Sequence, residues 1–582
     1  MCGIAGFSLR RGMAQRAVLE TMATALAHRG PDGEGFFTFL NMGLAHRRLA
    51  IIDVNGGRQP LEVKGTKAPV AAVVNGEIYN YRALQMNLLA EDVKLTTDSD
   101  SEPVLHLVMQ HEGAAFRQLE GMYAVAVADG RTGDMWLGTD PFGIKPLYYV
   151  ETDKGFAFAS EPRALVAGGW VSAAFNPDAL PGLLNQHYSR GAETLFLGVH
   201  RMLPGERLRV REGKIIERWQ QLPVLRPATR DMDLNDAIRQ FDERLTLAVQ
   251  RHLQSDVPYG VLLSGGLDSS SIVVAMAKLG VPIQAYTATF GNAGDEGEAA
   301  AALAARVGAK HVTVTYGADD FWQGLPQLAF VMDDLTTDYS SLPLLKLMER
   351  AKQDVKILLS GEGGDELLAG YRGYREGWLK TWLKGFRKGD ATPYANLFRT
   401  PALAEHPPEV SMPWDMQGFT RLQRHQSADI ATWLPNDLLL RLDRVSMAHG
   451  IEGRVPFLDD HFAPWAFALP DNIKVGTPEG ATKPLGKWVV REWLARQGHR
   501  DLVYGKKKGF SVPVGAYLAQ RTPQLTALWR TSPLLEGLLK PAASKILLGN
   551  LKHPKAANLA LTLTLLALWH QVHVEGKIPD LN

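Results

Sequence analysis

Val261-Leu-Leu-Ser-Gly-Gly-Leu-Asp-Ser-Ser270 is the stretch that decides the fold of this chain. Its apolar start predicts a β-strand, and the run from Ser271 to Leu279 that follows predicts a helix. The glycines between them, Gly265 and Gly266, let the backbone approach an anion closely, and the helix start offers unpaired N–H groups. No lysine follows in the arrangement of a Walker loop. The stretch therefore predicts a pyrophosphate-binding turn of another kind, with a plain strand-to-helix turn of small residues as the alternative.

A second glycine-rich turn, Ser360-Gly-Glu-Gly-Gly-Asp-Glu366, follows the apolar run from Val355 to Leu359. In an open α/β sheet, ligands bind at the carboxyl ends of the strands, so we expect Asp268 and Asp365 to face one another across a crevice. Two carboxylates next to a pyrophosphate indicate a magnesium site. A solvated acidic turn is the alternative for the second stretch.

The strand-like runs around these turns alternate with Ala- and Leu-rich helical stretches, which predicts a parallel sheet with crossover helices. That pattern begins near residue 236. Before it, from Cys2 to about Arg211, short β-rich runs alternate with turn residues, so the first half is expected to consist mainly of sheets. Residues 212–235 contain several Gln, Pro and Arg residues, and we expect them to link a domain of residues 1–211 to a domain of residues 236–582.

Cys2 is the single cysteine of the chain and stands directly after the initiator methionine. Once Met1 is removed, Cys2 carries its own α-amine, whose pKa of roughly 8 suits a general base, while its thiol is a strong nucleophile. We expect the mature protein to begin at Cys2, because an attached Met1 would turn this amine into an amide. The alternative is an ordinary small residue near a start codon. A single cysteine also excludes an intramolecular disulfide framework and a Cys-based zinc site.

The charges of the chain are balanced, with 63 Lys and Arg against 62 Asp and Glu and a net charge of +1. No overall field therefore draws the protein to nucleic acid or to an anionic membrane. The longest apolar stretch, Ala557 to Trp569, is interrupted by Asn558 and by threonines, so we expect a core helix rather than a membrane span. Neither a nucleic acid nor a membrane is an expected partner, and the cytoplasm is the expected compartment.

Three stretches together carry a resemblance to a known family: Cys2-Gly-Ile4, Ser264-Gly-Gly-Leu-Asp-Ser-Ser270 and Ser360-Gly-Glu-Gly-Gly-Asp-Glu366. With them the chain resembles the glutamine-hydrolysing asparagine synthetases over nearly its whole length. Further matches are His28-Arg-Gly-Pro-Asp-Gly33, Arg48-Leu-Ala-Ile-Ile-Asp53, Asn75-Gly-Glu-Ile-Tyr-Asn80, Asp140-Pro-Phe-Gly-Ile-Lys-Pro-Leu147, Asp443-Arg-Val-Ser-Met-Ala-His449 and Arg454-Val-Pro-Phe-Leu-Asp459. The resemblance implies an N-terminal-nucleophile hydrolase domain with an αββα sandwich, followed by a parallel-sheet ATP-pyrophosphatase domain of adenine-nucleotide α-hydrolase type with a helical C-terminal part.

The resemblance also implies the residues of a glutaminase site. The Cys2 thiolate would attack the side-chain amide of glutamine, and Asn75 and Gly76 would form the oxyanion hole. Arg48 is suited to the α-carboxylate of glutamine, and Asp100 and Glu77 to its α-ammonium group. The full set implied for glutamine is Arg48, Leu49, Ala50, Ile51, Ile52, Asn75, Gly76, Glu77 and Asp100.

For the second domain, the resemblance implies ATP as a substrate, Mg²⁺ on Asp268 and Asp365, and an acyl-adenylate that ammonia attacks. Lys507, in Lys506-Lys-Lys-Gly-Phe510, matches the family lysine that meets the charge on the adenylate, with its register within Lys506–Lys508 left open. An apolar tunnel would carry ammonia between the two sites. The residues implied for ATP are Leu262, Ser264, Gly265, Gly266, Leu267, Asp268, Ser269, Ser270, Ala288, Ser360, Gly361 and Glu362.

The acceptor carboxylate is where the chain departs from its family. Family members tend to carry Asp-Glu-Pro before an Asp-x-Ser-x-x-Pro run, whereas this chain reads Asp333-Asp-Leu-Thr-Thr-Asp-Tyr-Ser-Ser-Leu-Pro343. Aspartate is the leading acceptor, and a sugar acid, a peptide or a precursor of a secondary metabolite is the alternative. An ATP-driven cyclase of the same fold and a non-catalytic sensor are further alternatives; intact Cys2, Arg48, Asn75 and Asp100 speak against the cyclase. A homodimer is left open.

Overall fold

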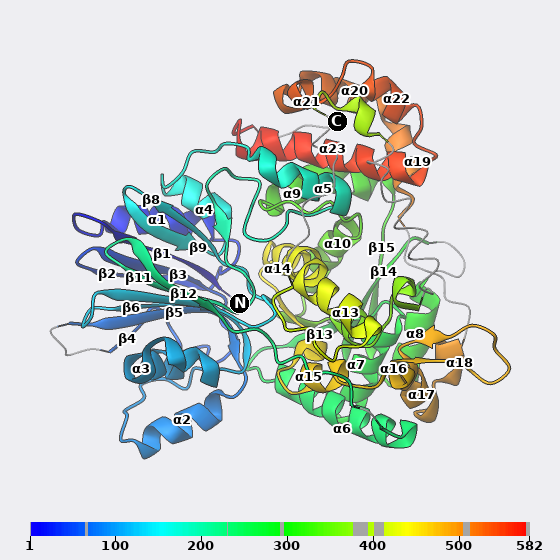
Figure 1. Ribbon diagram of the computed structural model, residues 1–582, viewed down its shortest axis with the longest axis horizontal. Coiled ribbons are helices and arrows are strands. Elements are labelled where there is room, and N and C mark those ends of the chain that lie inside the picture. The colour runs from blue at the N-terminus through cyan, green and yellow to red at the C-terminus, as the bar shows by residue number, and fades with distance from the viewer. Residues whose placement is uncertain are drawn as a thin grey trace.

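Two antiparallel sheets of six strands each stack face to face in the N-terminal half of the computed structural model (Figure 1). The structure describes residues 2–63, 68–229, 231–291, 296–375, 394–400, 412–504 and 512–577. The first sheet has the order β10 (His200–Arg201), β8 (Tyr148–Thr152), β9 (Gly155–Ala159), β1 (Gly3–Leu9), β3 (Met42–Arg48), β2 (Gly33–Phe39). The second has the order β12 (Lys214–Gln220), β11 (Glu206–Arg211), β7 (Asp134–Thr139), β6 (Gly121–Asp129), β5 (Val70–Ile78), β4 (Leu61–Val63).

Strand β6 shows how the sequence builds these layers. Its small residues Ala124, Ala126 and Ala128 belong to the core between the two sheets, while Tyr123 and its larger neighbours pack in a separate core on the opposite face. Side chains alternate along a strand, so a strand buried on both faces needs apolar residues at every position. Helices α2 (Tyr81–Ala90) and α3 (Glu102–His111) belong to that outer core, and α1 (Arg16–Ala25) and α4 (Pro162–Ala167) pack against the first sheet. The predicted αββα sandwich is confirmed.

The C-terminal half contains a five-stranded parallel sheet. Its order is β15 (Lys310–Thr315), β14 (Gln284–Thr289), β13 (Tyr259–Leu262), β16 (Ile357–Leu359), β17 (Glu452–Arg454). Parallel strands need crossover connections, and helices form these connections here. They are α7 (Leu267–Lys278), α8 (Glu296–Arg306), α9 (Ala318–Val331), α10 (Ser341–Ala351), α11 (Gly364–Leu367), α13 (Arg421–Ala431) and α14 (Leu440–Met447), and α6 (Leu234–His252) precedes the first strand, β13. The predicted parallel-sheet domain is confirmed.

Helices make up the rest of the described C-terminal part, apart from the short pair β18 (Val475–Gly476) and β19 (Leu485–Gly486). They are α15 (Phe462–Phe467), α16 (Asp471–Lys474), α17 (Trp488–Arg496), α18 (Arg500–Tyr504), α19 (Val514–Gln520), α20 (Thr522–Thr531), α21 (Pro533–Leu538), α22 (Ala543–Leu548) and α23 (Pro554–His573). Helix α23 is buried from Leu559 to Trp569, so the expected core helix is confirmed. Within the described ranges, no helix is both long and apolar enough to cross a bilayer.

The remaining short helices are α5 (Leu180–Gln186), the π-helical turn η6 (Leu434–Leu439), and the 3₁₀ turns η1 (Glu112–Gln118), η2 (Pro177–Ala179), η3 (Arg372–Arg375), η4 (Ala395–Leu397) and η7 (Pro456–Leu458).

The start of the predicted linker is corrected by the structure. Residues 214–220 form β12, which pairs with β11 at the edge of the second sheet, instead of an irregular connection. Most side chains of β12 are exposed or half-buried, because an edge strand packs on few neighbours. Its polar composition therefore resembles that of a linker, and the irregular connection runs from Gln221 to the start of α6.

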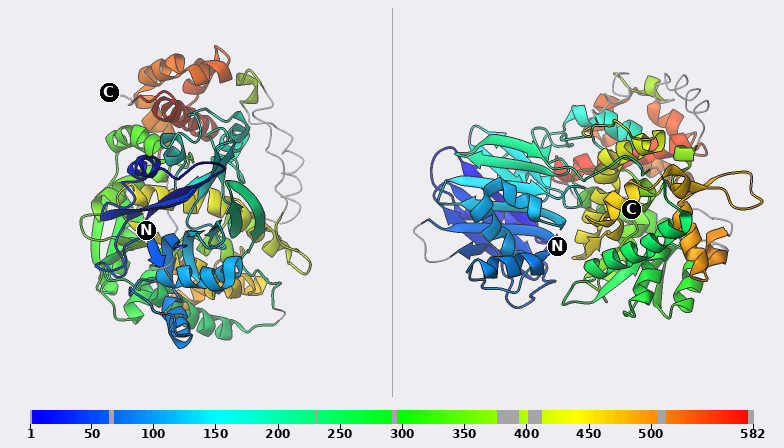
Figure 2. Two further views of the ribbon diagram at one scale, coloured as in Figure 1. Left: turned by 90° about the vertical axis from the view of Figure 1, so that its left-hand side faces the viewer. Right: turned by 60° about the horizontal axis from the view of Figure 1, so that its bottom comes forward.

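The two halves of the chain lie side by side (Figure 2). Buried charges join them. Arg29 is fully buried and donates to Asp443 at 2.8 and 3.0 Å and to Glu161 at 2.9 Å. Arg29 Nε also donates to the carbonyl oxygen of Cys2, so this ion pair lies directly behind the start of β1. Because these charges are withdrawn from water, each depends on its partners, and Asp443 is the partner that belongs to the C-terminal half.

Candidate active sites

The thiol of Cys2 lies between the two N-terminal sheets. Cys2 precedes β1 and is only 7% exposed. Its backbone N–H donates to Asn75 Oδ1, from β5 of the other sheet, at 2.9 Å, and its Sγ lies 3.9 Å from the carbonyl oxygen of Leu49. Burial raises the pKa of the thiol, so it needs a neighbouring base to ionise at neutral pH.

Asn75 has an arrangement suited to stabilising an oxyanion. The side chain is fully buried, and its Nδ2 has no hydrogen-bond partner within the described part of the chain. A buried donor without a partner costs free energy unless a ligand or an intermediate uses it. Gly76 follows with φ of +145°, and a Cβ there would lie 1.9 Å from the carbonyl oxygen of Met122. Local packing therefore requires glycine beside this free donor.

A small cavity adjoins the thiol, with a volume of about 20 Å³. This is room for roughly one water molecule, so the cavity must widen before an amino acid can enter. The predicted residues that line it are Cys2, Arg48, Leu49, Ile51, Ile52, Gly76, Glu77 and Asp100. Residues that were not predicted also line it: Gly57, Gln59, Val74, Ser99 and Ser101. The predicted residues Asn75 and Ala50 are not part of the lining, and the N–H of Ala50 donates to Asp32.

The charged residues of this cavity are engaged in different ways. Arg48 donates to the carbonyl oxygens of Val54 at 2.8 Å and Asp53 at 2.6 Å, and so holds the backbone that covers the cavity. Asp100 accepts from the N–H of Ile78 at 2.9 Å. Burial raises the pKa of Asp100 to about 6.

Glu77 was predicted to bind glutamine, but its carboxylate points toward the other half of the protein. Its Oε2 lies 3.3 Å from Arg454 Nη2, on β17 of the parallel sheet. Burial, with the nearby carboxylate of Glu452, raises the pKa of Glu77 well above its usual range. The glutamine-side cavity and the second domain therefore share a buried contact between Glu77 and Arg454, which the sequence of residues 75–80 does not reveal.

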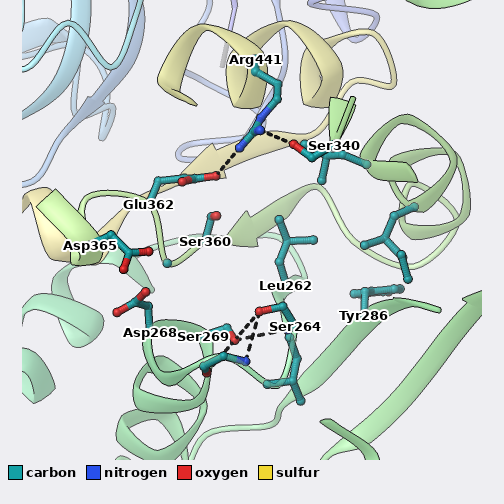
Figure 3. Close-up of a pocket in the computed structure, with 16 residues that line it drawn as sticks. Leu262, Ser264, Asp268, Ser269, Tyr286, Ser340, Ser360, Glu362, Asp365 and Arg441 are labelled. Atoms are coloured by element: carbon teal, nitrogen blue, oxygen red, sulfur yellow. Dashed lines mark hydrogen bonds and ion pairs between the residues drawn. The ribbon is translucent and has the colours of Figure 1, made fainter. Parts of the chain in front are cut away.

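A larger cavity of about 280 Å³ lies at the carboxyl ends of β13, β14 and β16 (Figure 3). The predicted nucleotide residues that line it are Leu262, Ser264, Gly266, Asp268, Ser269, Ala288, Ser360, Gly361 and Glu362. Gly265, Leu267 and Ser270 were also predicted but do not line it. Gly265 has φ of +72° and forms the turn, and Ser270 is buried inside α7.

The turn before α7 is ordered by its own serines. Ser264 Oγ lies 3.2 Å from Ser269 Oγ and accepts from the N–H of Gly266 at 3.3 Å. Helix α7 begins directly afterwards, so its unpaired N–H groups and positive dipole end are near the cavity. This arrangement can hold a phosphate or pyrophosphate group.

Asp268 and Asp365 lie together, as predicted, and Lys487 lies between them (Figure 3 shows the two carboxylates). Lys487 Nζ is 2.5 Å from Asp365 Oδ1 and pairs with Asp268 Oδ2. Burial alone would lower the pKa of Lys487, but the two carboxylates raise it above its usual value. Across the described segments, no group of three or more His, Cys, Asp or Glu side chains could hold a metal. Mg²⁺ commonly takes one or two carboxylates and completes its shell with phosphates and water, so Asp268 and Asp365 are of the type that holds Mg²⁺ delivered with a nucleotide. Lys487 would then have to leave its position between them.

Arg441 forms the far end of this cavity and was not predicted (Figure 3). It donates to Asp338 at 2.8 Å and to Glu362 at 3.0 Å, and it also contacts Ser340. Lys487 and Arg441 carry no local signal, because an isolated cation in a sequence is usually at the surface. The predicted catalytic Lys507 lies in residues 505–511, outside the described residues.

Comparison with known proteins matches both halves of the chain to known families. Residues 240–571 match the family model described as asparagine synthase, and residues 1–220 match the model described as a glutamine amidotransferase domain. Asparagine synthetase (glutamine-hydrolyzing) 1 of Bacillus subtilis (strain 168) is 28% identical over 99% of this chain and 98% of its own length. Asparagine synthetase (glutamine-hydrolyzing) 2 of the same organism is 30% identical over 88% of this chain and 72% of its own. A relative of the same description from Arabidopsis thaliana, number 3, is 28% identical over 88% of this chain and 79% of its own.

Proposed function

The chain belongs to the asparagine synthase family, and from this premise we propose that it is an ATP-dependent ligase that takes nitrogen from glutamine and amidates a carboxylate. The observation that carries the proposal is the pairing of Cys2 with Asn75, whose buried Nδ2 remains free to donate. A nucleophile beside an unused donor is what hydrolysis of an amide needs. The second cavity, with its glycine-rich turn and paired carboxylates, supplies the place for the nucleotide.

In the first half-reaction, Cys2 Sγ attacks the side-chain amide carbon of glutamine. The α-amine of Cys2, present once Met1 is removed, takes the thiol proton and later gives it to the leaving ammonia. Asn75 Nδ2 donates to the oxyanion of the tetrahedral intermediate. Arg48 and Asp100 hold the two charged groups of the substrate backbone, and water then hydrolyses the thioester to glutamate.

In the second half-reaction, the acceptor carboxylate attacks the α-phosphorus of ATP, and pyrophosphate leaves. The turn at Ser264–Ser269 and the start of α7 hold the phosphates. Asp268 and Asp365 would hold Mg²⁺, which neutralises phosphate charge when it is bound. Ammonia then attacks the acyl carbon and AMP leaves. Lys507 remains the proposed lysine for the charge that develops on the adenylate.

Aspartate is the acceptor we propose. The relatives are named asparagine synthetases, and the far end of the cavity carries both signs of charge, from Arg441 and from Glu362 and Asp338. An amino acid with an ammonium group and carboxylates is complementary to such a set. The run from Asp333 to Pro343 lacks the family's Asp-Glu-Pro element, which favours a different carboxylic acid as the second candidate.

A screen for pyrophosphate release over carboxylic acids, with glutamine and Mg-ATP present, tests the proposal. We expect aspartate to give AMP, pyrophosphate, glutamate and asparagine in equal amounts. Release with another acid and none with aspartate would instead establish the second candidate. We expect Cys2→Ala to lose synthesis from glutamine and to keep synthesis from ammonium. Loss of both, or the absence of AMP with every acid, would overturn the two-site scheme.

A further inference from the structure

Residues 49–57, which we term the covering segment, form one wall of the cavity beside Cys2. Two hydrogen bonds join this segment to Asp256 of the second domain. The N–H of Asp53 donates to Asp256 Oδ2 at 2.8 Å, and the N–H of Asp256 donates to the carbonyl oxygen of Ile51 at 3.0 Å. The covering segment is therefore attached to a residue more than 200 positions away in the chain.

A second attachment passes through Asp32. Its Oδ2 accepts from the N–H of Ala50 at 2.8 Å and from Lys356 Nζ, also at 2.8 Å. Lys356 belongs to the second domain, so its ammonium group fixes the carboxylate that holds the beginning of the covering segment. Asp256 and Lys356 thus hold the segment at two points.

Both residues stand at the beginning of strands that lead to the nucleotide cavity. Asp256 shortly precedes β13, and Lys356 directly precedes β16. The N–H of Lys356 donates to the carbonyl oxygen of Pro258 at 3.1 Å, and the strands then pair in parallel from Tyr259 and Ile357 onward. Since each residue of a strand spans roughly 3.3 Å, Lys356 lies at most about 13 Å from Ser360, and Asp256 at most about 26 Å from Ser264. Two short, paired strands therefore connect the attachment points to the turns of the nucleotide cavity.

The free cavity shows why these attachments matter for glutamine. Arg48 uses its guanidinium on the carbonyl oxygens of Asp53 and Val54, so in this state it anchors the covering segment as well. When Arg48 turns to a substrate carboxylate, it releases those carbonyls. The segment is then held by Asp256, by Asp32 with Lys356, and by the N–H of Asp98, which donates to Asp53 Oδ2 at 3.1 Å. The substrate-bound state depends more on these attachments than the free state does.

We propose that Asp256 and Lys356 are positioning residues for the glutamine site, which set the covering segment and couple it to occupancy of the nucleotide cavity. This inference rests on the proposed function of the two sites. Neither residue contacts a substrate; both act through the backbone that they hold.

Replacement of Lys356 by methionine tests the proposal. The attachment is half-exposed, with side-chain exposures of 38% for Lys356 and 29% for Asp32. We therefore expect a KM for glutamine raised about fivefold, in the range of an exposed charged hydrogen bond. Synthesis from ammonium should stay within about twofold, since the nucleotide turns keep their own contacts. Lys356→Arg should restore the KM, and Asp256→Ala should raise it in the same way.

Lys346→Met is the matched control. Lys346 pairs with Asp320 at 2.6 Å with exposures of 34% and 28%, inside the second domain and away from the covering segment. We expect it to leave the KM for glutamine unchanged.

The effect of the nucleotide tests the coupling between the two sites. In wild-type enzyme, Mg-ATP with the acceptor should change the KM for glutamine, and in Lys356→Met this change should be smaller.

Three results would each overturn the inference. The KM for glutamine could be unchanged in Lys356→Met, it could rise equally in Lys346→Met, or the KM of the wild-type enzyme could be the same with and without the nucleotide. Loss of ammonium-dependent synthesis in Lys356→Met would also count against it. Failure of the proposed function is a different result, since wild-type enzyme would then form neither glutamate nor AMP.

Discussion

Replacing Asn75 with alanine separates the catalytic role of this residue from its structural role. In the free enzyme, Asn75 makes one hydrogen bond from Cys2 N–H and leaves its Nδ2 buried without a partner in the described chain. If that donor serves the oxyanion of the intermediate, its loss should slow glutamine hydrolysis far more than it weakens the fold.

The expected changes in kcat and in stability follow from the two polar atoms of the Asn75 side chain, Nδ2 and Oδ1. Removal of a single oxyanion donor typically costs about 10²- to 10³-fold in kcat, or roughly 2.7–4 kcal/mol. For stability, loss of the Cys2 bond costs about 1 kcal/mol, whereas deletion of an unsatisfied donor removes a penalty of about 1–3 kcal/mol. These contributions have opposite signs, so we expect a change in Tm within about 4 °C.

Asn176→Ala is the matched control for this experiment. Asn176 is also buried in the N-terminal domain, but its side chain is fully used: Oδ1 accepts from Asp178 N–H at 3.1 Å and Nδ2 donates to the carbonyl oxygen of Thr194 at 2.9 Å. We expect Asn176→Ala to lower Tm more than Asn75→Ala and to leave the kcat of glutamine hydrolysis nearly unchanged.

Glutamate formation and ammonium-dependent pyrophosphate release, measured on the same preparations, check this prediction. Asn75→Ala should lose the first activity and keep the second. The reasoning is refuted if Asn75→Ala keeps more than about a tenth of the wild-type kcat, or if its Tm falls as far as that of Asn176→Ala.

Three further predictions concern the other charges of the molecule. Arg29→Met should lower the free energy of unfolding by about 3–5 kcal/mol in denaturant titrations, because it removes the cation nearest to the buried Asp443 and leaves Arg444, at 3.4 Å from Asp443 and 3.6 Å from Glu161, as the cation that they share. A loss below about 1 kcal/mol would contradict this. Asp365→Ala should abolish pyrophosphate release and keep glutamine hydrolysis, as measured in separate assays, and retention of Mg-ATP turnover would remove Asp365 from the proposed metal site. Burial raises the pKa of Asp100 to about 6, so the carboxyl is neutral below that pH and ionised above it. In a pH profile, kcat/KM for glutamine should therefore rise through about pH 6. Asp100→Asn should have a lower kcat/KM that does not rise in this range.

The sequence predicted those parts of the fold that depend on a short stretch of neighbouring residues. The strand, glycine turn and helix at Val261–Ser270 lie within one short stretch, and the alternation of alanines with large residues in β6 follows from the geometry of a strand buried on both faces. Edge strand β12 was misread, because its exposed side chains lack that alternation of buried residues. Ser99, Ser101 and Gln59 were missed at the first cavity, since small polar residues are common in any loop.

The sequence by itself determined that a sheet sandwich precedes a parallel-sheet fold and that a glycine-rich turn follows the strand at Val261, and it predicted Cys2 as the nucleophile. Each of these depends on backbone conformation or chemistry within a few neighbouring residues. Only the tertiary structure decided that Lys487 lies between Asp268 and Asp365, that Glu77 pairs with Arg454, and that Lys356 supports Asp32. These partners are separated by hundreds of residues, and a charged side chain carries the same letter whether it is solvated or buried. The role of a charged side chain depends on the charged partner beside it, and the packing of whole domains decides which partner that is.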